Sequence, residues 1–151
     1  MEANDSATLD GATAAQARVI ARLARVFETR LADEPMSLPQ FRLLSFLSEG
    51  DWAASVLAEW LAVSRPSVTA LVDGLVERGW VERRDSPDDR RRVLHQITDD
   101  GRAQLIAATS CLTRALDDLF SHLDAEERAR ADAGLAAVAD ALHRHWEATR
   151  A

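Results

Sequence analysis

The chain of 151 residues contains one cysteine, no tyrosine and no lysine. The single cysteine, Cys111, excludes an intramolecular disulfide and is typical of proteins in a reducing cytosol. No apolar run approaches the roughly 18 residues that a membrane-spanning helix needs. The first fifteen residues carry acids without a basic segment, so they do not resemble a secretory signal. We therefore expect a cytoplasmic protein that makes no membrane contact.

All 18 basic residues are arginines, and 25 acidic residues give a net charge of −7, which argues against a general polyanion binder. The charge is unevenly distributed. Residues 59–98 hold as many arginines as acids, so the net negative charge lies entirely outside them. Residues 83–92 hold five arginines against three acids. This pattern predicts a local cationic site that selects its target rather than coating any polyanion.

Hydrophobic periodicity divides the chain into three parts within a single domain, residues 1–151. Apolar side chains recur at helical spacing over residues 12–31, and Pro35 ends this segment. The ten residues at the start of the chain are expected to be frayed. A second, shorter helix is predicted between Ser37 and Gly50.

Two helices joined by a tight connection are predicted for the middle of the chain. The first is short and includes Leu57 and Leu61. The second has Ser64 as its N-cap and Pro66 in its first turn, where the missing amide costs little. Gly79 ends it. Its buried face should consist of Val68, Leu71, Val72, Leu75 and Val76.

A β-hairpin is predicted directly after these helices. Residues 80–84 and 92–97 alternate as strands do, and the polar residues 85–89 between them contain a proline. Helix, turn, helix and hairpin in this order form a winged helix-turn-helix. The predicted fold is therefore mainly α with a small β-hairpin, and long N- and C-terminal helices flank the winged helix-turn-helix.

Two long helices are predicted for the last third of the chain. Thr98 caps the first, which runs to about Ser121, and Asp124 with Glu127 forms a capping box for the second. The second helix carries an apolar stripe too extensive for a lone surface helix, and exposed stripes of this kind mark interfaces. The stripe consists of Leu135, Val138, Ala139, Leu142 and Trp146. We therefore expect a partner chain.

The helix that begins at Arg65 should turn a polar face away from the core. Arg65 can bind two acceptors of a guanine, and Ser67 and Thr69 are undemanding donors. Ala70 can meet a thymine methyl group, and the helix N-terminus attracts phosphate. Alone, this face is equally compatible with a solvated surface, but the hairpin that follows it favours DNA readout. Asp73 is interpreted as bracing a nearby arginine or the hairpin.

Three segments between Ser37 and Gly101 resemble the MarR family of transcription factors: SLPQFRLLSFL, LAEWLAVSRPSVTALVDGLVERGWVERR and SPDDRRRVLHQITDDG. The resemblance implies a homodimer in which residues 12–34 and 98–149 interleave as dimerisation helices. It implies that residues 37–97 bind double-stranded DNA at a pseudo-palindromic operator. It also implies a ligand-responsive repressor, with a pocket between these parts for a small-molecule effector such as an aromatic or phenolic compound.

Residues 64–78 match the family's recognition helix, which enters the major groove, and residues 83–92 match its wing, which enters the minor groove. In the wing, the resemblance implies that Asp89 braces Arg91. The sequence departs from the family at Ala62, where glycine is common, and at Ala70 and Gly74, where basic or polar residues are common. The predicted DNA-binding residues are Ser64, Arg65, Pro66, Ser67, Thr69, Ala70, Arg83, Arg84, Asp89, Arg90 and Arg91.

Other candidate sites carry weaker signals. Asp99 and Asp100 complement a helix dipole, and His143 and His145 are badly spaced for chelating a metal. Cys111 is expected to pack as a small hydrophobe, and Trp52, Trp60 and Trp146 to pack in the core rather than line a pocket. The sequence contains no nucleophile–base constellation and no glycine-rich phosphate loop, so we expect no enzyme, cofactor or metal.

The alternative function is a dimeric winged-helix module that binds another protein without binding an operator. Ala70 and Gly74 favour it, because they leave the recognition helix without cations at those positions. A gel shift with the DNA upstream of the protein's own gene would distinguish the two functions.

Overall fold

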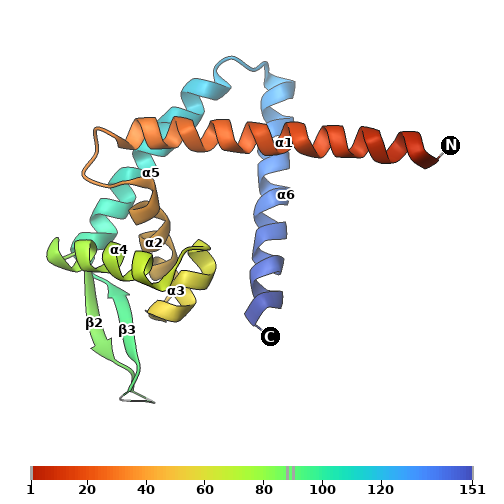
Figure 1. The fold of residues 1–151 in the computed structure, drawn as a ribbon. Helices are drawn as coiled ribbons and strands as arrows, with labels where there is room; N and C mark the ends of the chain where they lie inside the picture. Colours follow the sequence, from red (N-terminus) through yellow and green to blue (C-terminus); the bar gives the residue numbers. More distant parts are fainter. Residues whose placement is uncertain (1, 88, 90, 151) are drawn as a thin grey trace.

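The computed structural model describes the backbone of residues 2–87, 89 and 91–150, and the side chains of residues 13–87, 89 and 91–148. Its elements follow the predicted order, and the fold is mainly helical with one small antiparallel sheet (Figure 1). The helices are α1 (Glu2–Leu31), α2 (Leu38–Glu49), α3 (Ala54–Leu61), α4 (Arg65–Glu77), α5 (Asp99–Phe120) and α6 (Ala125–Arg150). The strands are β1 (Trp52–Ala53), β2 (Val81–Asp85) and β3 (Val93–Ile97).

The predicted helix ends are confirmed where a side chain caps them. The Ser64 hydroxyl accepts the amide of Ser67, and the Thr98 hydroxyl accepts that of Gly101. Asp124 and Glu127 form the predicted capping box, each carboxylate accepting the other residue's amide at 2.8–3.0 Å. The predicted frayed start is wrong: α1 begins at Glu2 rather than near residue 12.

The sheet has one strand more than predicted. β1 pairs antiparallel with β3, which also pairs with β2, giving the order β1-β3-β2. β1 is only two residues long, which is too short to show the alternation that predicts a strand. It is a strand only because it pairs with β3, which is distant in the sequence. We call the hairpin of β2, its turn and β3 the wing; it projects from the lower left of the molecule in Figure 1.

The core lies where α2, α3, α4 and α5 meet the base of the sheet. Val68, Val72 and Leu75 of α4 are fully buried, as predicted, whereas Leu71 and Val76 are half-buried at the edge of this core. The other large, fully buried side chains are Leu31, Met36, Leu43, Leu44, Leu47 and Leu57. This packing fixes α4 and the wing on one rigid lobe.

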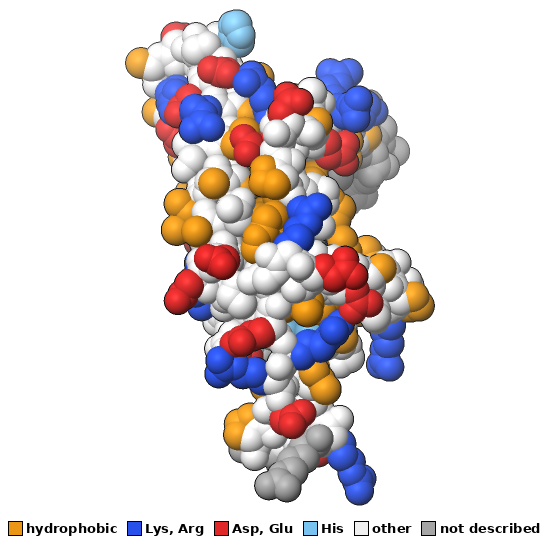
Figure 2. Space-filling view, turned by 90° about the vertical axis from the view of Figure 1, so that its left-hand side faces the viewer, with side chains coloured by type: hydrophobic (Ala, Val, Ile, Leu, Met, Phe, Trp, Pro, Cys, Tyr) orange, Lys and Arg blue, Asp and Glu red, His pale blue; other side chains and the backbone are white. Residues whose placement is uncertain are grey.

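The long helices keep much of their apolar surface uncovered within one chain. Hydrophobic side chains gather in the upper part of the face in Figure 2, at the height of α1. The exposed fractions range from 36% to 64% for Val19, Ile20, Leu119, Leu123, Leu135, Val138 and Leu142. Trp146 differs from the rest of its stripe, because its ring packs edge-on against Phe46 at 5.4 Å between centroids.

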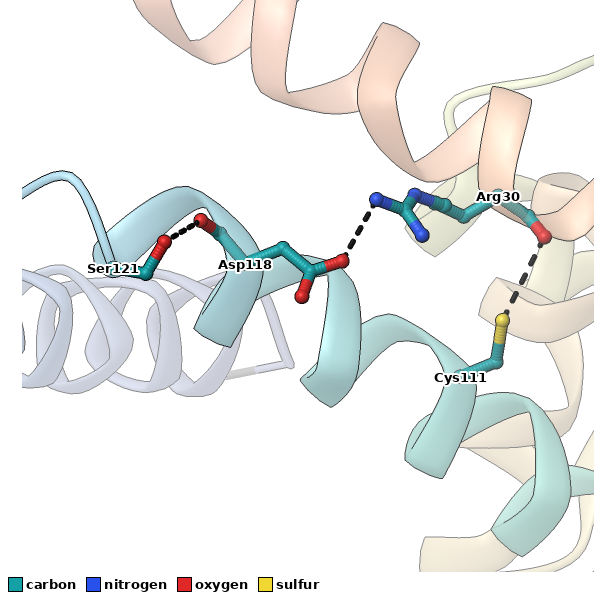
Figure 3. A network of polar contacts seen from close by, with 4 residues as sticks. All are labelled: Arg30, Cys111, Asp118 and Ser121. Carbon is teal, nitrogen blue, oxygen red and sulfur yellow. Dashed lines mark hydrogen bonds and ion pairs between the residues drawn. The ribbon is translucent and has the colours of Figure 1, made fainter.

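The C-terminal end of α1 is tied to α5 by polar contacts (Figure 3). The Arg30 guanidinium pairs with Asp118 at 2.8 Å, and the Cys111 thiol lies 3.6 Å from the Arg30 carbonyl oxygen. Cys111 is half-buried in this packing, as the sequence predicts. No helix among the described residues is long and apolar enough to cross a membrane.

Candidate nucleic-acid interface

The N-terminal end of α4 is exposed and well ordered by its cap. The Ser64 and Ser67 hydroxyls lie 2.8 Å apart, and the Thr69 hydroxyl donates to the Arg65 carbonyl oxygen at 3.0 Å. Each predicted contact residue on this helix is solvent-exposed, namely Ser64, Arg65, Pro66, Ser67, Thr69 and Ala70. The structure therefore presents these side chains together on the surface opposite the buried face of α4.

The turn between α3 and α4 places Ala62 in the left-handed region, with φ 53° and ψ 43°. A non-glycine residue in this conformation costs about 1 kcal/mol, which explains why glycine is common at this position in the family. Arg42 of α2 donates to the Leu61 carbonyl oxygen at 3.4 Å, beside this turn. Sequence reasoning missed Arg42, because the contact joins two segments 19 residues apart.

Asp73 of α4 forms an ion pair with Arg83 of β2, which confirms that this acid braces an arginine of the wing. The next arginine is paired as well: Arg84 lies 2.6 Å from Glu82, on the same strand. Two of the predicted DNA-contact arginines therefore already have acidic partners within the chain.

The wing tip is organised by Asp89 in a way the sequence did not predict. Its carboxylate accepts the backbone amide of Arg91 at 2.9 Å, and no ion pair among the described residues joins it to the Arg91 guanidinium. Asp89 therefore does brace Arg91, as the resemblance implies, but through the main-chain amide, and the Arg91 side chain stays exposed. Arg90, also predicted to contact DNA, lies outside the described residues.

The base of the wing is fastened to the start of α5. The Thr98 hydroxyl donates to the Gly79 carbonyl oxygen at 2.7 Å, and the Thr98 amide donates to that of Trp80 at 3.0 Å. The buried Gly101 packs against the same Trp80 carbonyl group. Arg78, at the end of α4, lies over the Trp80 ring, 5.1 Å from its centroid. A movement of α5 would therefore move the wing with it.

His95 occupies the middle of the sheet and is 5% exposed. Its Nδ1 lies 3.0 Å from the Trp52 carbonyl oxygen, and it is the cross-strand partner of Arg83. Burial lowers the pKa of His95 below 6.5; the Trp52 carbonyl and Asp73 oppose this shift, and Arg83 adds to it. His95 is therefore neutral in the folded protein near neutral pH.

This lowered pKa predicts that acid destabilises the fold. Below pH 6.5 the unfolded chain binds a proton at His95 that the folded chain does not, so the free energy of unfolding should fall until the pH reaches the folded-state pKa. Urea unfolding of wild type and His95→Gln between pH 8 and 5 measures this. The substitution should remove part of the pH dependence of the free energy of unfolding. Identical pH profiles for wild type and His95→Gln would contradict the assignment.

The remaining candidates from the sequence form no catalytic or metal site among the described residues. No three His, Cys, Asp or Glu side chains there are grouped to hold a metal ion. His143 lies 3.3 Å from Glu147 on the same helix. Trp52 and Trp60 pack against each other at 4.6 Å between ring centroids, beside the core.

Comparisons with known proteins agree with this geometry. The MarR family matches residues 35–92. The multiple antibiotic resistance protein MarR of Salmonella typhimurium is 31% identical over 100 residues, which are 66% of this chain and 67% of that protein. The crystal structure of apo MarR from E. coli has a TM-score of 0.77 and 26% identity, covering 83% of this chain and 94% of that one. The transcriptional repressor CouR, bound to a 23-mer DNA duplex, has a TM-score of 0.68 and 31% identity, covering 83% and 89%.

Proposed function

Because the chain belongs to the MarR family of DNA-binding transcriptional regulators, which are not enzymes, we propose that it represses transcription as a homodimer bound to a pseudo-palindromic operator. One observation carries this proposal: the exposed N-terminal end of α4 and the projecting wing belong to the same lobe (Figure 1). In this arrangement α4 enters the major groove and the wing reaches the flanking minor groove. The protein acts in the cytoplasm, where its operator lies.

The uncovered apolar surface supports the homodimer. A groove of about 430 Å³ runs between α1, α5 and α6 and is lined by Val19, Leu23, Val26, Leu116 and Leu135, among others. Continuous apolar surface of this kind is rare on monomeric proteins. We propose that residues 12–34 and 98–149 of a second copy cover it, which sets two α4 helices about 34 Å apart for adjacent half-sites.

We further propose that a small aromatic or phenolic effector releases the operator. A hollow of about 460 Å³ lies between the end of α1, the start of α2 and Arg78, with Leu31 and Met36 in its wall. Arg78 also donates to the Pro35 carbonyl group there. A ligand that binds better to one spacing of the two α4 helices would shift the dimer toward that spacing. Release of bound DNA by phenolic compounds tests this.

A gel shift with the DNA upstream of the protein's own gene tests the main proposal. We expect a complex that survives an excess of random duplex. Equal binding to both duplexes, or none, would overturn the proposal and favour the protein-binding module.

Arg65 and Arg91 should contribute to DNA binding in different ways. Arg65→Ala should cost about 1–3 kcal/mol and relax discrimination at one base pair per half-site, because Arg65 can reach base edges. Arg91→Ala should weaken binding to all sequences and reduce the salt dependence by about one unit per half-site, because its charge meets phosphate. Asp89→Asn should weaken binding less than Arg91→Ala, because Arg91 keeps its charge and the asparagine oxygen still accepts its main-chain amide, only less strongly than a carboxylate does.

Affinities measured against salt concentration, on specific and random duplexes, separate these effects. An Arg91→Ala variant with unchanged affinity and slope would show that this hairpin does not bind DNA.

A further inference from the structure

We propose that Asp73 and Glu82 determine specificity by neutralising two arginines of the wing, which keeps these cations from binding DNA of any sequence. The inference rests on the proposed DNA binding. It assigns a function to two acids, one on α4 and one within the wing, that the binding scheme above does not use.

The two arginines are neighbours on β2, so their side chains leave opposite faces of the sheet. Arg83 lies on the face of its cross-strand partner His95 and pairs there with Asp73 of α4. Arg84 lies on the other face, where its Nη2 and Nε are 2.6 Å and 2.8 Å from the Glu82 carboxylate. Each of the two arginines therefore has its own acidic partner, one on each face of β2.

Fold stability does not explain these two pairs. The side chains are between 41% and 61% exposed, and exposed ion pairs contribute little to the free energy of unfolding. The Glu82–Arg84 pair joins residues on one strand, so it holds no two elements together. Both ion pairs instead reduce the positive charge on the surface of the wing.

The predicted DNA-contact arginines that the structure describes comprise two without an ion pair and two with one. Among the described residues, Arg65 at the start of α4 and Arg91 at the wing tip take part in no ion pair, whereas both arginines of β2 do. Basic and acidic side chains also lie next to one another over the lower half of the face in Figure 2. Among these four predicted contacts, the two unpaired arginines thus lie where base edges and the minor groove would be read, and the two on β2 are neutralised.

Neutralised arginines should affect specific and non-specific binding unequally. Binding to random DNA comes almost entirely from cations that displace counterions from phosphates. An arginine that already has a carboxylate partner displaces fewer counterions. The two ion pairs therefore lower the affinity for DNA of random sequence. Contacts by Arg65 and Arg91 at the operator are left intact, which widens the difference between operator and random DNA.

The test uses full-length Asp73→Asn and Glu82→Gln, with Asp85→Asn as the matched control. Asp85 lies on the same strand and makes no ion pair with the described residues, so its substitution removes the same charge without releasing an arginine. Affinity for a random duplex is measured from 50 to 200 mM salt, and urea unfolding checks that each variant is folded.

We expect each released arginine to steepen the salt dependence by about 0.9 for every protomer bound, which is about a 3.5-fold larger loss of affinity per protomer over this range. Asp85→Asn should leave the slope unchanged. The double variant Asp73→Asn/Arg83→Gln should return to the wild-type slope, a reversal that a purely structural role of Asp73 would not produce.

Wild-type slopes in both Asp73→Asn and Glu82→Gln, or an equal increase in Asp85→Asn, would overturn the proposal. If Asp73→Asn does not fold, the slope of Glu82→Gln alone tests the proposal, because the Glu82–Arg84 pair lies within one strand and its loss should leave the fold intact. The slopes are measured on a random duplex, so they decide this inference even if the protein does not prefer the DNA upstream of its gene. That absence of preference would overturn only the proposed function.

Discussion

Gly101→Ala is expected to lower the free energy of unfolding by about 3 kcal/mol, the upper range for overpacking a core, and to weaken DNA binding with it. A Cβ atom on Gly101 would lie 2.1 Å from the Trp80 carbonyl oxygen and 2.9 Å from Cγ1 of Ile97. The first of these neighbours is backbone that also accepts the Thr98 amide, so it cannot turn aside as a flexible side chain would. The clash can therefore be relieved only if α5 moves away from the base of the wing.

Gly74→Ala is the matched control for this prediction. A Cβ atom there meets only Gln40 Nε2, at 3.9 Å, and alanine stabilises a helix interior by up to about 1 kcal/mol relative to glycine. In urea unfolding, the free energy of unfolding should therefore be lower than wild type for Gly101→Ala and higher than wild type for Gly74→Ala. If Gly101→Ala were as stable as wild type, the close approach of α5 to the base of the wing would be refuted.

Truncation after Asp124 is expected to abolish the dimer and operator binding together. It removes α6 and with it the exposed side chains of Leu135, Val138 and Leu142, one wall of the apolar surface assigned to the second copy. Without that surface the two α4 helices are no longer held at the half-site spacing, and a single lobe binds one half-site weakly.

The full-length variant Leu135→Glu/Val138→Glu tests the same interface without removing a helix. Both side chains are about half exposed in one chain, so carboxylates there should leave the monomer folded and prevent dimerisation. Sedimentation equilibrium gives the oligomeric state, and anisotropy gives DNA binding. A truncated protein that is folded and still protects both half-sites would contradict the dimer.

Features set by local sequence could be predicted, because their causes lie within a few residues. The caps at Ser64 and Thr98 and the buried face of Val68, Val72 and Leu75 follow from side-chain chemistry and helical periodicity. The strands of the wing lie within one residue of their predicted bounds, since alternation and the polar turn determine them together.

Features that depend on distant partners could not be predicted. β1 is two residues long and is defined by pairing with β3, 43 residues away at Trp52 and His95. That pairing in turn buries His95, whose burial nothing near it in the sequence indicates. Asp89 was correctly placed at the wing tip, but whether its carboxylate binds the side chain or the amide of Arg91 depends on the turn conformation.

Hydroxyl-radical footprinting of the wild-type protein on the DNA upstream of its own gene tests the central claim most directly. A homodimer that places two α4 helices in successive major grooves should protect two symmetric segments whose centres lie about one helical turn, or 34 Å, apart. Protection in the flanking minor grooves should disappear in Arg91→Ala, while the central protections remain. A single protected segment would contradict the account. So would the absence of protection at protein concentrations where all of the protein is dimeric.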